Sequence, residues 1–147
     1  HRRPLGLLTP EEAVEEFDAT TRAIAALGET RRIFRPYGGG GKIGPHLMQQ
    51  AVVERMVAER YTCVVWNVVP GDWRDPEGWL ARAEGMVESH NWSLVVLHDI
   101  HAQAMGHLDA FLRHLRAQGF EFRQDFPPGC MPIVDGRVAM PLDNFSR

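Results

Sequence analysis

The chain has 147 residues, enough for one domain of ordinary size and too few for two. Hydrophobic residues make up 44% and charged residues 24%, proportions that are typical of globular proteins and exclude global disorder. Sixteen Lys and Arg against nineteen Asp and Glu give a net charge of -3, which argues against a nucleic-acid partner, because nucleic-acid binders normally carry a basic excess. No apolar stretch approaches the ~18 residues of a membrane span, so no span is predicted.

Four helices are expected from helical spacing of apolar residues. The first begins at the capping box Thr9-Pro10-Glu11-Glu12 and is ended by Gly28. The other three are expected over about 45–60, 75–89 and 104–118.

Four strands are expected between these helices, over about 32–35, 62–69, 93–97 and 120–122. The run from Thr62 to Val69 is apolar and β-branched, which is typical of a strand buried on both faces. Alternating helices and strands predict an α/β fold of βα units with a parallel sheet, either open or rolled into a barrel. A complete eight-unit barrel takes about 250 residues, so four units form only part of one.

The chain changes character after Arg123. Six of the residues from Gln124 to Pro141 are Pro or Gly, which predicts irregular structure. We therefore expect one α/β domain over 1–123 and an irregular tail over 124–147 that packs on the same domain.

Candidate functional side chains follow three of the expected strands. Arg35 ends the first, Asp72 and Trp73 follow the second, and His98 ends the third. The carboxyl ends of parallel strands meet at one edge, where α/β proteins carry their sites, so these side chains are expected in one cleft. Each also has a simpler interpretation. His98 is then a hydrogen-bonded loop residue and Asp72 a turn cap. Trp73 then packs under a helix, and Arg35 is a surface ion-pair partner.

Two other patterns are weaker. The loop Gly38–Gly41 continues into Lys42 and Ile43 and lacks the Ser or Thr that follows Gly-Lys in a phosphate-binding loop. This counts against a doubly wound nucleotide- or small-ligand-binding domain. His98, Asp99 and His101 match no standard zinc spacing.

The strand-end residues resemble three motifs of the polysaccharide deacetylase family (NodB-homology domain, carbohydrate esterase family 4). These are Phe34-Arg35-Pro36-Tyr37-Gly38, the segment from Trp66 to Pro70-Gly71-Asp72-Trp73, and Leu94-Val95-Val96-Leu97-His98-Asp99. The motifs occur in the family's order, and the resemblance covers about Thr9 to Phe122. It implies a distorted β/α barrel and metal-dependent removal of acetyl groups from an amino sugar polysaccharide or a related acylated amine.

The resemblance also implies a role for each matched residue. His98 would be the general acid that protonates the leaving amine, Asp72 would hold that histidine, and Arg35 would position the catalytic base. The substrate would contact three further side chains: Tyr37, Trp73 and Leu97.

Two family motifs have no complete counterpart. The Asp-Asp strand end that supplies the base is missing, and His1 matches only the second histidine of the His-x-x-x-His motif. The resemblance thus implies one metal ligand in this chain, His1. The remaining ligands of a divalent ion, by resemblance zinc, are expected upstream. We expect the chain to be the C-terminal part of a longer deacetylase that lacks its N-terminal barrel strands and is inactive alone.

A second hypothesis is a catalytically incomplete relative that binds a glycan or a protein, with the aromatic side chains of Tyr37 and Trp73 stacking on sugars. Trp66, Trp79 and Trp92 have apolar neighbours and are expected in the core instead. The expected partner of the enzyme is an acetylated carbohydrate. The missing N-terminal segment and a second copy of the chain are further partners that the sequence neither predicts nor excludes. The cell envelope and the cytoplasm are both left open as locations.

Overall fold

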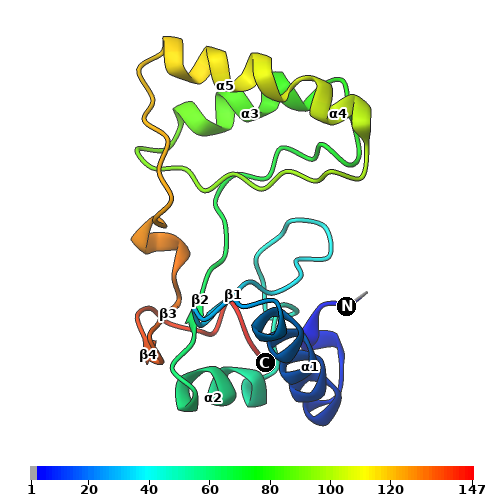
Figure 1. Ribbon diagram of the computed structural model, residues 1–147, viewed down its shortest axis with the longest axis vertical. Coiled ribbons are helices and arrows are strands. Elements are labelled where there is room, and N and C mark those ends of the chain that lie inside the picture. The colour runs from blue at the N-terminus through cyan, green and yellow to red at the C-terminus, as the bar shows by residue number, and fades with distance from the viewer. Residues whose placement is uncertain (1–2) are drawn as a thin grey trace. The chain divides into compact units, whose positions relative to one another are not determined.

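A computed structural model describes residues 3–147, so His1, the expected metal ligand, lies outside the described residues. The chain forms two compact units (Figure 1). Unit 1 contains the residues up to Val65 together with Met131–Arg147, and unit 2 contains Trp66–Cys130.

Unit 1 begins with a short 3-10 helix, η1 (Leu5–Leu7), and contains helices α1 (Pro10–Ala26) and α2 (Gln50–Ala58). The expected capping box starts α1: the Glu12 N–H donates to Thr9 Oγ1 at 3.3 Å, and the Thr9 N–H donates to Glu12 Oε2 at 3.0 Å. These two bonds satisfy backbone donors that the first helical turn leaves unpaired. The predicted start of this helix is confirmed.

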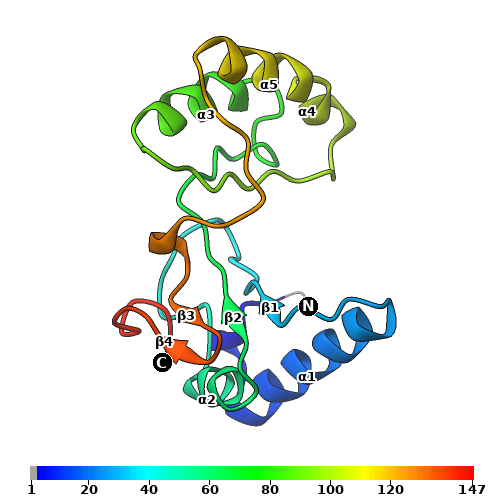
Figure 2. The ribbon, with the colours of Figure 1, turned by 60° about the vertical axis from the view of Figure 1, so that its left-hand side comes forward.

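Unit 1 also contains a small sheet of four two-residue strands (Figure 2), β1 (Ile33–Phe34), β2 (Thr62–Cys63), β3 (Ile133–Val134) and β4 (Arg137–Val138). Their order is β1-β2-β3-β4, with β1 and β2 parallel and the other two pairs antiparallel. Phe17 of α1 packs edge-to-face against Phe34 of β1 at 4.8 Å. Burial raises the pKa of the Cys63 thiol to about 12, as expected for a small core residue.

The antiparallel pair β3–β4 is joined by the two residues Asp135 and Gly136, both with positive φ (49° and 74°). Asp-Gly is a favoured sequence for a hairpin loop with two left-handed residues. Gly136 also lies close to α2, because a Cβ at this position would come within 2.6 Å of the Val57 carbonyl oxygen. The turn therefore needs glycine for its backbone angle and for space.

Replacing Gly136 with alanine is expected to lower the free energy of unfolding by more than about 1 kcal/mol, since alanine fits neither the φ angle nor the contact. Gly85→Ala is the matched control. Gly85 lies inside a helix of unit 2 with open space around it, so alanine there should stabilise by about 1 kcal/mol. Urea unfolding followed by circular dichroism measures both changes. A Gly136→Ala protein as stable as the parent would contradict the role given to this turn.

Unit 2 contains helices α3 (Trp79–Glu88), α4 (Ala102–Gly106) and α5 (Leu108–Ala117), followed by a 3-10 turn, η2 (Pro128–Cys130). Figures 1 and 2 show the three helices on one side of two extended segments. Trp79 is fully buried, packs edge-to-face on Phe111 at 5.4 Å, and donates from Nε1 to the Ala104 carbonyl at 3.0 Å. The core of unit 2 consists of Val68, Trp79, Ala83, Val87, Ala104, Phe111 and Leu115.

The two extended segments of unit 2 meet in a single parallel bridge between Val68 and Val95. The Val68 N–H donates to the Leu94 carbonyl at 3.2 Å, and the Val96 N–H donates to the Val68 carbonyl at 3.0 Å. The Asn67 side chain extends this pairing: its Nδ2 donates to the Trp92 carbonyl, and its Oδ1 accepts from the Leu94 N–H. Residues 66–69 and 93–97 thus run side by side in parallel.

The structure is mixed α/β, as expected, but the sheet differs from the prediction. The described residues form a small open sheet with parallel and antiparallel pairs, and they do not form the alternating parallel βα units of a partial barrel. The expected strand at 93–97 is reduced to the Val95 bridge, and 120–122 form no strand. Part of the expected irregular tail forms η2, β3 and β4 instead.

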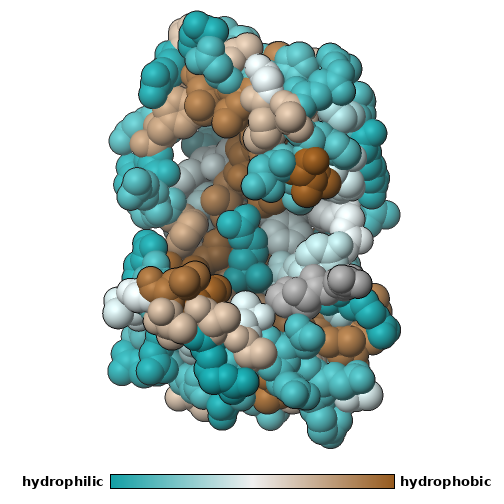
Figure 3. Space-filling model, turned by 45° about the vertical axis from the view of Figure 1, so that its right-hand side comes forward, coloured by the Kyte–Doolittle hydropathy of each residue, from teal (hydrophilic) through white to brown (hydrophobic). Residues whose placement is uncertain are grey.

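Charged and polar side chains cover much of the face shown in Figure 3. Some large hydrophobic residues are also exposed, most strongly Leu27 (88%), Ile100 (64%) and Val138 (54%). Isolated exposed hydrophobic residues are common in folded proteins. Every helix in residues 3–147 is too short or too polar to cross a membrane.

Candidate active site

Asp72 and His98 form the most distinctive polar contact of unit 2. Asp72 Oδ1 lies 3.0 Å from His98 Nδ1, and Asp72 Oδ2 accepts the backbone N–H of His98 at 2.6 Å. Both carboxylate oxygens therefore bind one residue, which fixes its backbone and its ring together. The prediction that these two residues meet is confirmed.

The parallel pairing explains why they meet. Val68 and Val95 lie opposite each other, and the two segments run in the same direction, so the residues that follow them reach the same end. Gly71, with φ of 76°, then turns the chain, and its carbonyl accepts the N–H groups of Arg74 and Asp75. This turn brings Asp72 beside His98.

The two members of the pair differ in burial. The Asp72 side chain is 0% exposed, whereas the His98 side chain is 39% exposed. A buried carboxylate needs hydrogen-bond partners, and Asp72 has both in His98. Because Nδ1 faces Asp72, the opposite ring nitrogen, Nε2, is the one free to serve a reacting molecule.

Trp73 completes the immediate surroundings of the histidine. Its ring lies edge-to-face against the His98 ring, with centroids 4.7 Å apart and an interplanar angle of 69°. The Arg74 guanidinium lies over the same indole, 5.3 Å from the ring centroid. The tryptophan thus packs against the His98 ring. The predicted role of Trp73 as a wall of the acetyl pocket stays a prediction.

The other predicted substrate contacts are placed as follows. Leu97 is half-buried and packs against the hydrophobic core of unit 2. Arg35 directly follows β1 and is exposed, and Tyr37 is 44% exposed. Both belong to unit 1, so a cleft shared by Arg35 with Asp72 and His98 stays a prediction.

Asn67 is a residue of this region that the strand-end argument did not include. Its amide binds the Trp92 carbonyl at 2.9 Å and the Leu94 N–H at 2.7 Å, and so sets the register of the two segments that carry Asp72 and His98. The signal in the sequence is a single amide residue inside the apolar run from Thr62 to Val69.

Zinc is the metal that the resemblance implies. Among residues 3–147, no three His, Cys, Asp or Glu side chains are arranged to hold a metal ion. These residues alone therefore do not form a zinc site.

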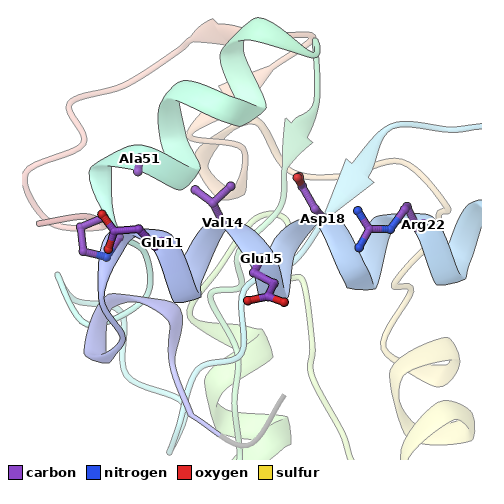
Figure 4. Close-up of a pocket in the computed structure, with 7 residues that line it drawn as sticks. Glu11, Val14, Glu15, Asp18, Arg22 and Ala51 are labelled. Carbon is purple, nitrogen blue, oxygen red and sulfur yellow. The ribbon is translucent and has the colours of Figure 1, made fainter.

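A shallow pocket of about 510 Å³ lies between α1 and α2 in unit 1. Figure 4 shows Val14 and Asp18 of α1 pointing toward α2. Asp18 accepts two hydrogen bonds from Arg55 of α2, both at 3.1 Å. Its carboxylate thus links the two helices. The pocket lining contains no carboxylate paired with a histidine.

Comparison of the sequence with protein-family models and with curated proteins finds no match.

Proposed function

We propose that the protein is a deacetylase-type hydrolase that removes acetyl groups from an amino sugar polysaccharide or a related acylated amine. The observation that carries this proposal is the buried Asp72 carboxylate holding the partly exposed His98 ring through Nδ1. The sequence resemblance supports the substrate class.

His98 would supply the proton that amide hydrolysis requires. When water adds to an amide carbonyl, the resulting intermediate breaks down easily only if the amine leaves in its protonated form. A protonated His98 would donate from Nε2 to the departing nitrogen while Nδ1–H stays bound to Asp72. The buried carboxylate keeps this orientation, as in other carboxylate–histidine pairs.

The other predicted residues would act around this step. Trp73 borders the histidine and would form one wall of the acetyl pocket, with Leu97 as a neighbour. Arg35 would position a catalytic base, and Tyr37 would contact the sugar. The divalent metal of this reaction class would, when bound, polarise the carbonyl and activate water, and His1 is the one ligand that the resemblance assigns in this sequence.

Zinc content tests the metal part of the proposal. We expect the 147-residue chain to retain well under one zinc ion after dialysis against zinc-free buffer, because zinc sites normally use three or four protein ligands. The protein translated from the complete reading frame that contains this chain should retain one. Stoichiometric zinc on the 147-residue chain would contradict the expectation.

Acetate release tests the reaction itself. The complete reading-frame product should release acetate from N-acetylglucosamine oligosaccharides when zinc is supplied. The binding hypothesis predicts that the same oligosaccharides bind without acetate release. Acetate measured by enzymatic assay, beside binding measured by calorimetry, therefore separates the two hypotheses.

A further inference from the structure

The turn that carries Asp72 is held to α3 by the side chain of Arg82. Its Nε donates to the Pro70 carbonyl at 2.8 Å, and its Nη1 donates to Asp75 Oδ2 at 2.7 Å. Pro70 and Asp75 stand at the two ends of the turn, and Asp72 lies between them in the sequence. Arg82 therefore contacts the turn on both sides of the residue that binds His98.

Helix α3 gives Arg82 a fixed base. Trp79, Ala83 and Val87 share this helix and are buried in the core of unit 2. The Arg82 side chain is 44% exposed, yet its bond to the Pro70 carbonyl is partly buried. A hydrogen bond from a charged guanidinium is stronger where it is shielded from water than at the open surface. The contact with Pro70 is therefore expected to restrain the turn.

The Pro70 carbonyl is a sensitive place to hold this turn. It belongs to the peptide group that joins Pro70 to Gly71, and Gly71 has a φ of 76°, in the left-handed region. Peptide groups are planar, so rotation of this one changes the direction in which the chain leaves Gly71 toward Asp72. Arg82 opposes that rotation, because the carbonyl would turn away from Nε.

The contact between Asp72 and His98 tolerates little movement of the turn. Asp72 uses both oxygens, at 2.6 Å from the His98 backbone nitrogen and at 3.0 Å from Nδ1. Since hydrogen bonds to nitrogen extend only to about 3.2 Å, a shift of the carboxylate by about 1 Å would break at least one of the two.

The contact of Arg82 with Asp75 is of a different kind. The Asp75 side chain is 50% exposed, and exposed ion pairs contribute little. Asp75 Oδ1 also accepts the Gly78 N–H at 2.9 Å, at the start of α3. Hydrogen bonds from Arg82 and Gly78 lower the pKa of Asp75, so this carboxylate is charged at neutral pH. The bond to Pro70 is thus the contact through which Arg82 would restrain Asp72.

We propose that Arg82 is a positioning residue: its bond to the Pro70 carbonyl fixes the turn that presents Asp72 to His98. The effect on the geometry of the pair is independent of any reaction. The effect on turnover rests on the proposed function, since only then does the His98 ring transfer a proton.

Arg82→Lys tests this role. Lysine has a methylene at the position of Nε, so it loses the donor to Pro70 but keeps a positive charge for Asp75 and a similar helix propensity. Long-range ¹H–¹⁵N NMR of the ¹⁵N-labelled 147-residue chain distinguishes the Nδ1–H and Nε2–H forms of the neutral His98 ring. The parent should hold mainly the Nδ1–H form. In Arg82→Lys its ratio to the Nε2–H form should fall about three- to tenfold, the scale of one hydrogen bond.

Two variants are the controls. Arg113→Lys makes the same change at an exposed arginine of α5, which pairs with Asp109. Asp75→Asn removes the ion pair with Arg82 and leaves Nε bound to Pro70. Both should keep the tautomer ratio of the parent, and circular dichroism checks that all three variants fold.

Turnover is the second measurement. In the complete reading-frame product, Arg82→Lys should lower the turnover number roughly 10- to 100-fold and change KM little, because a small misplacement of a reacting group slows the chemical step. A parent that releases no acetate would contradict the proposed function and leave the tautomer ratio to decide on Arg82. The positioning role is overturned if Arg82→Lys keeps the tautomer ratio of the parent, if Asp75→Asn changes it equally, or if Arg82→Lys alone fails to fold.

Discussion

Replacing His98 with alanine should slow deacetylation by the complete reading-frame product about 10²–10⁴-fold, the usual contribution of a general acid or base. The reason is that Asp72 holds Nδ1 and leaves Nε2 as the proton donor for the leaving amine. Zinc content should not change, because His98 is not a proposed ligand. Turnover number and bound zinc, measured on the same preparations, test both statements.

Two comparisons make this result specific. His101→Ala is the matched control, because His101 is an exposed histidine at the start of α4 whose side chain forms no capping hydrogen bond, and it should retain full activity. A nitroanilide substrate has a better leaving group, needs less proton donation, and should therefore lose less rate in His98→Ala. Equal losses for poor and good leaving groups, or loss of zinc, would remove His98 from the role of general acid.

Asp72→Asn should have the second largest effect. The amide keeps the size of the side chain and one oxygen, but it cannot hold both the backbone N–H and Nδ1–H of His98 as a charged carboxylate does. In carboxylate–histidine pairs this change costs up to about 10⁴-fold in turnover. Here the reason would be the loss of the negative charge that stabilises and orients the protonated imidazole. Turnover of the complete reading-frame product measures the loss.

Asp75→Asn is the matched control for Asp72→Asn. Asp75 lies in the same loop but is exposed and binds Arg82 at 2.7 Å and the Gly78 N–H at 2.9 Å. Its loss should leave turnover within about twofold, since exposed ion pairs contribute little. Turnover that falls equally in the two variants would indicate that the loop as a whole, and not the pair with His98, supports activity.

Local signals in the sequence predicted the local structure well. The capping box at Thr9 starts α1, because the two hydrogen bonds involve residues only three positions apart. The Asp-Gly dipeptide before Arg137 was an equally local signal for the β3–β4 hairpin, but the surrounding prolines and glycines favoured an irregular tail. That hairpin pairs with β2, which is distant in sequence, and no local pattern identifies such a partner.

Pairing between distant segments limited the rest of the fold prediction. The apolar run at 93–97 was expected to form a full strand, yet its partner segment supplies the Asn67 side chain where backbone pairing would otherwise continue. The pattern of hydrophobic residues does not show where a side chain replaces backbone pairing. It likewise suggested one helix over 104–118, whereas the structure divides this region at His107 into α4 and α5.

The candidate site was predictable where it depends on one parallel pairing. Asp72 and His98 follow neighbouring segments that run in the same direction, so the general rule for strand ends brought them together correctly. Arg35 follows a strand of the other unit, and strand order alone does not determine where it lies relative to the pair.

We propose that the Asp72–His98 pair delivers a proton during amide hydrolysis. The most direct measurement is the rate of acetate release from N-acetylglucosamine oligosaccharides by the zinc-loaded complete reading-frame product, with and without the His98→Ala change. The proposal predicts acetate release by the parent protein and a rate about 10²–10⁴-fold lower in the variant at equal zinc content. Equal rates in the two proteins, or no acetate release by the parent, would contradict it.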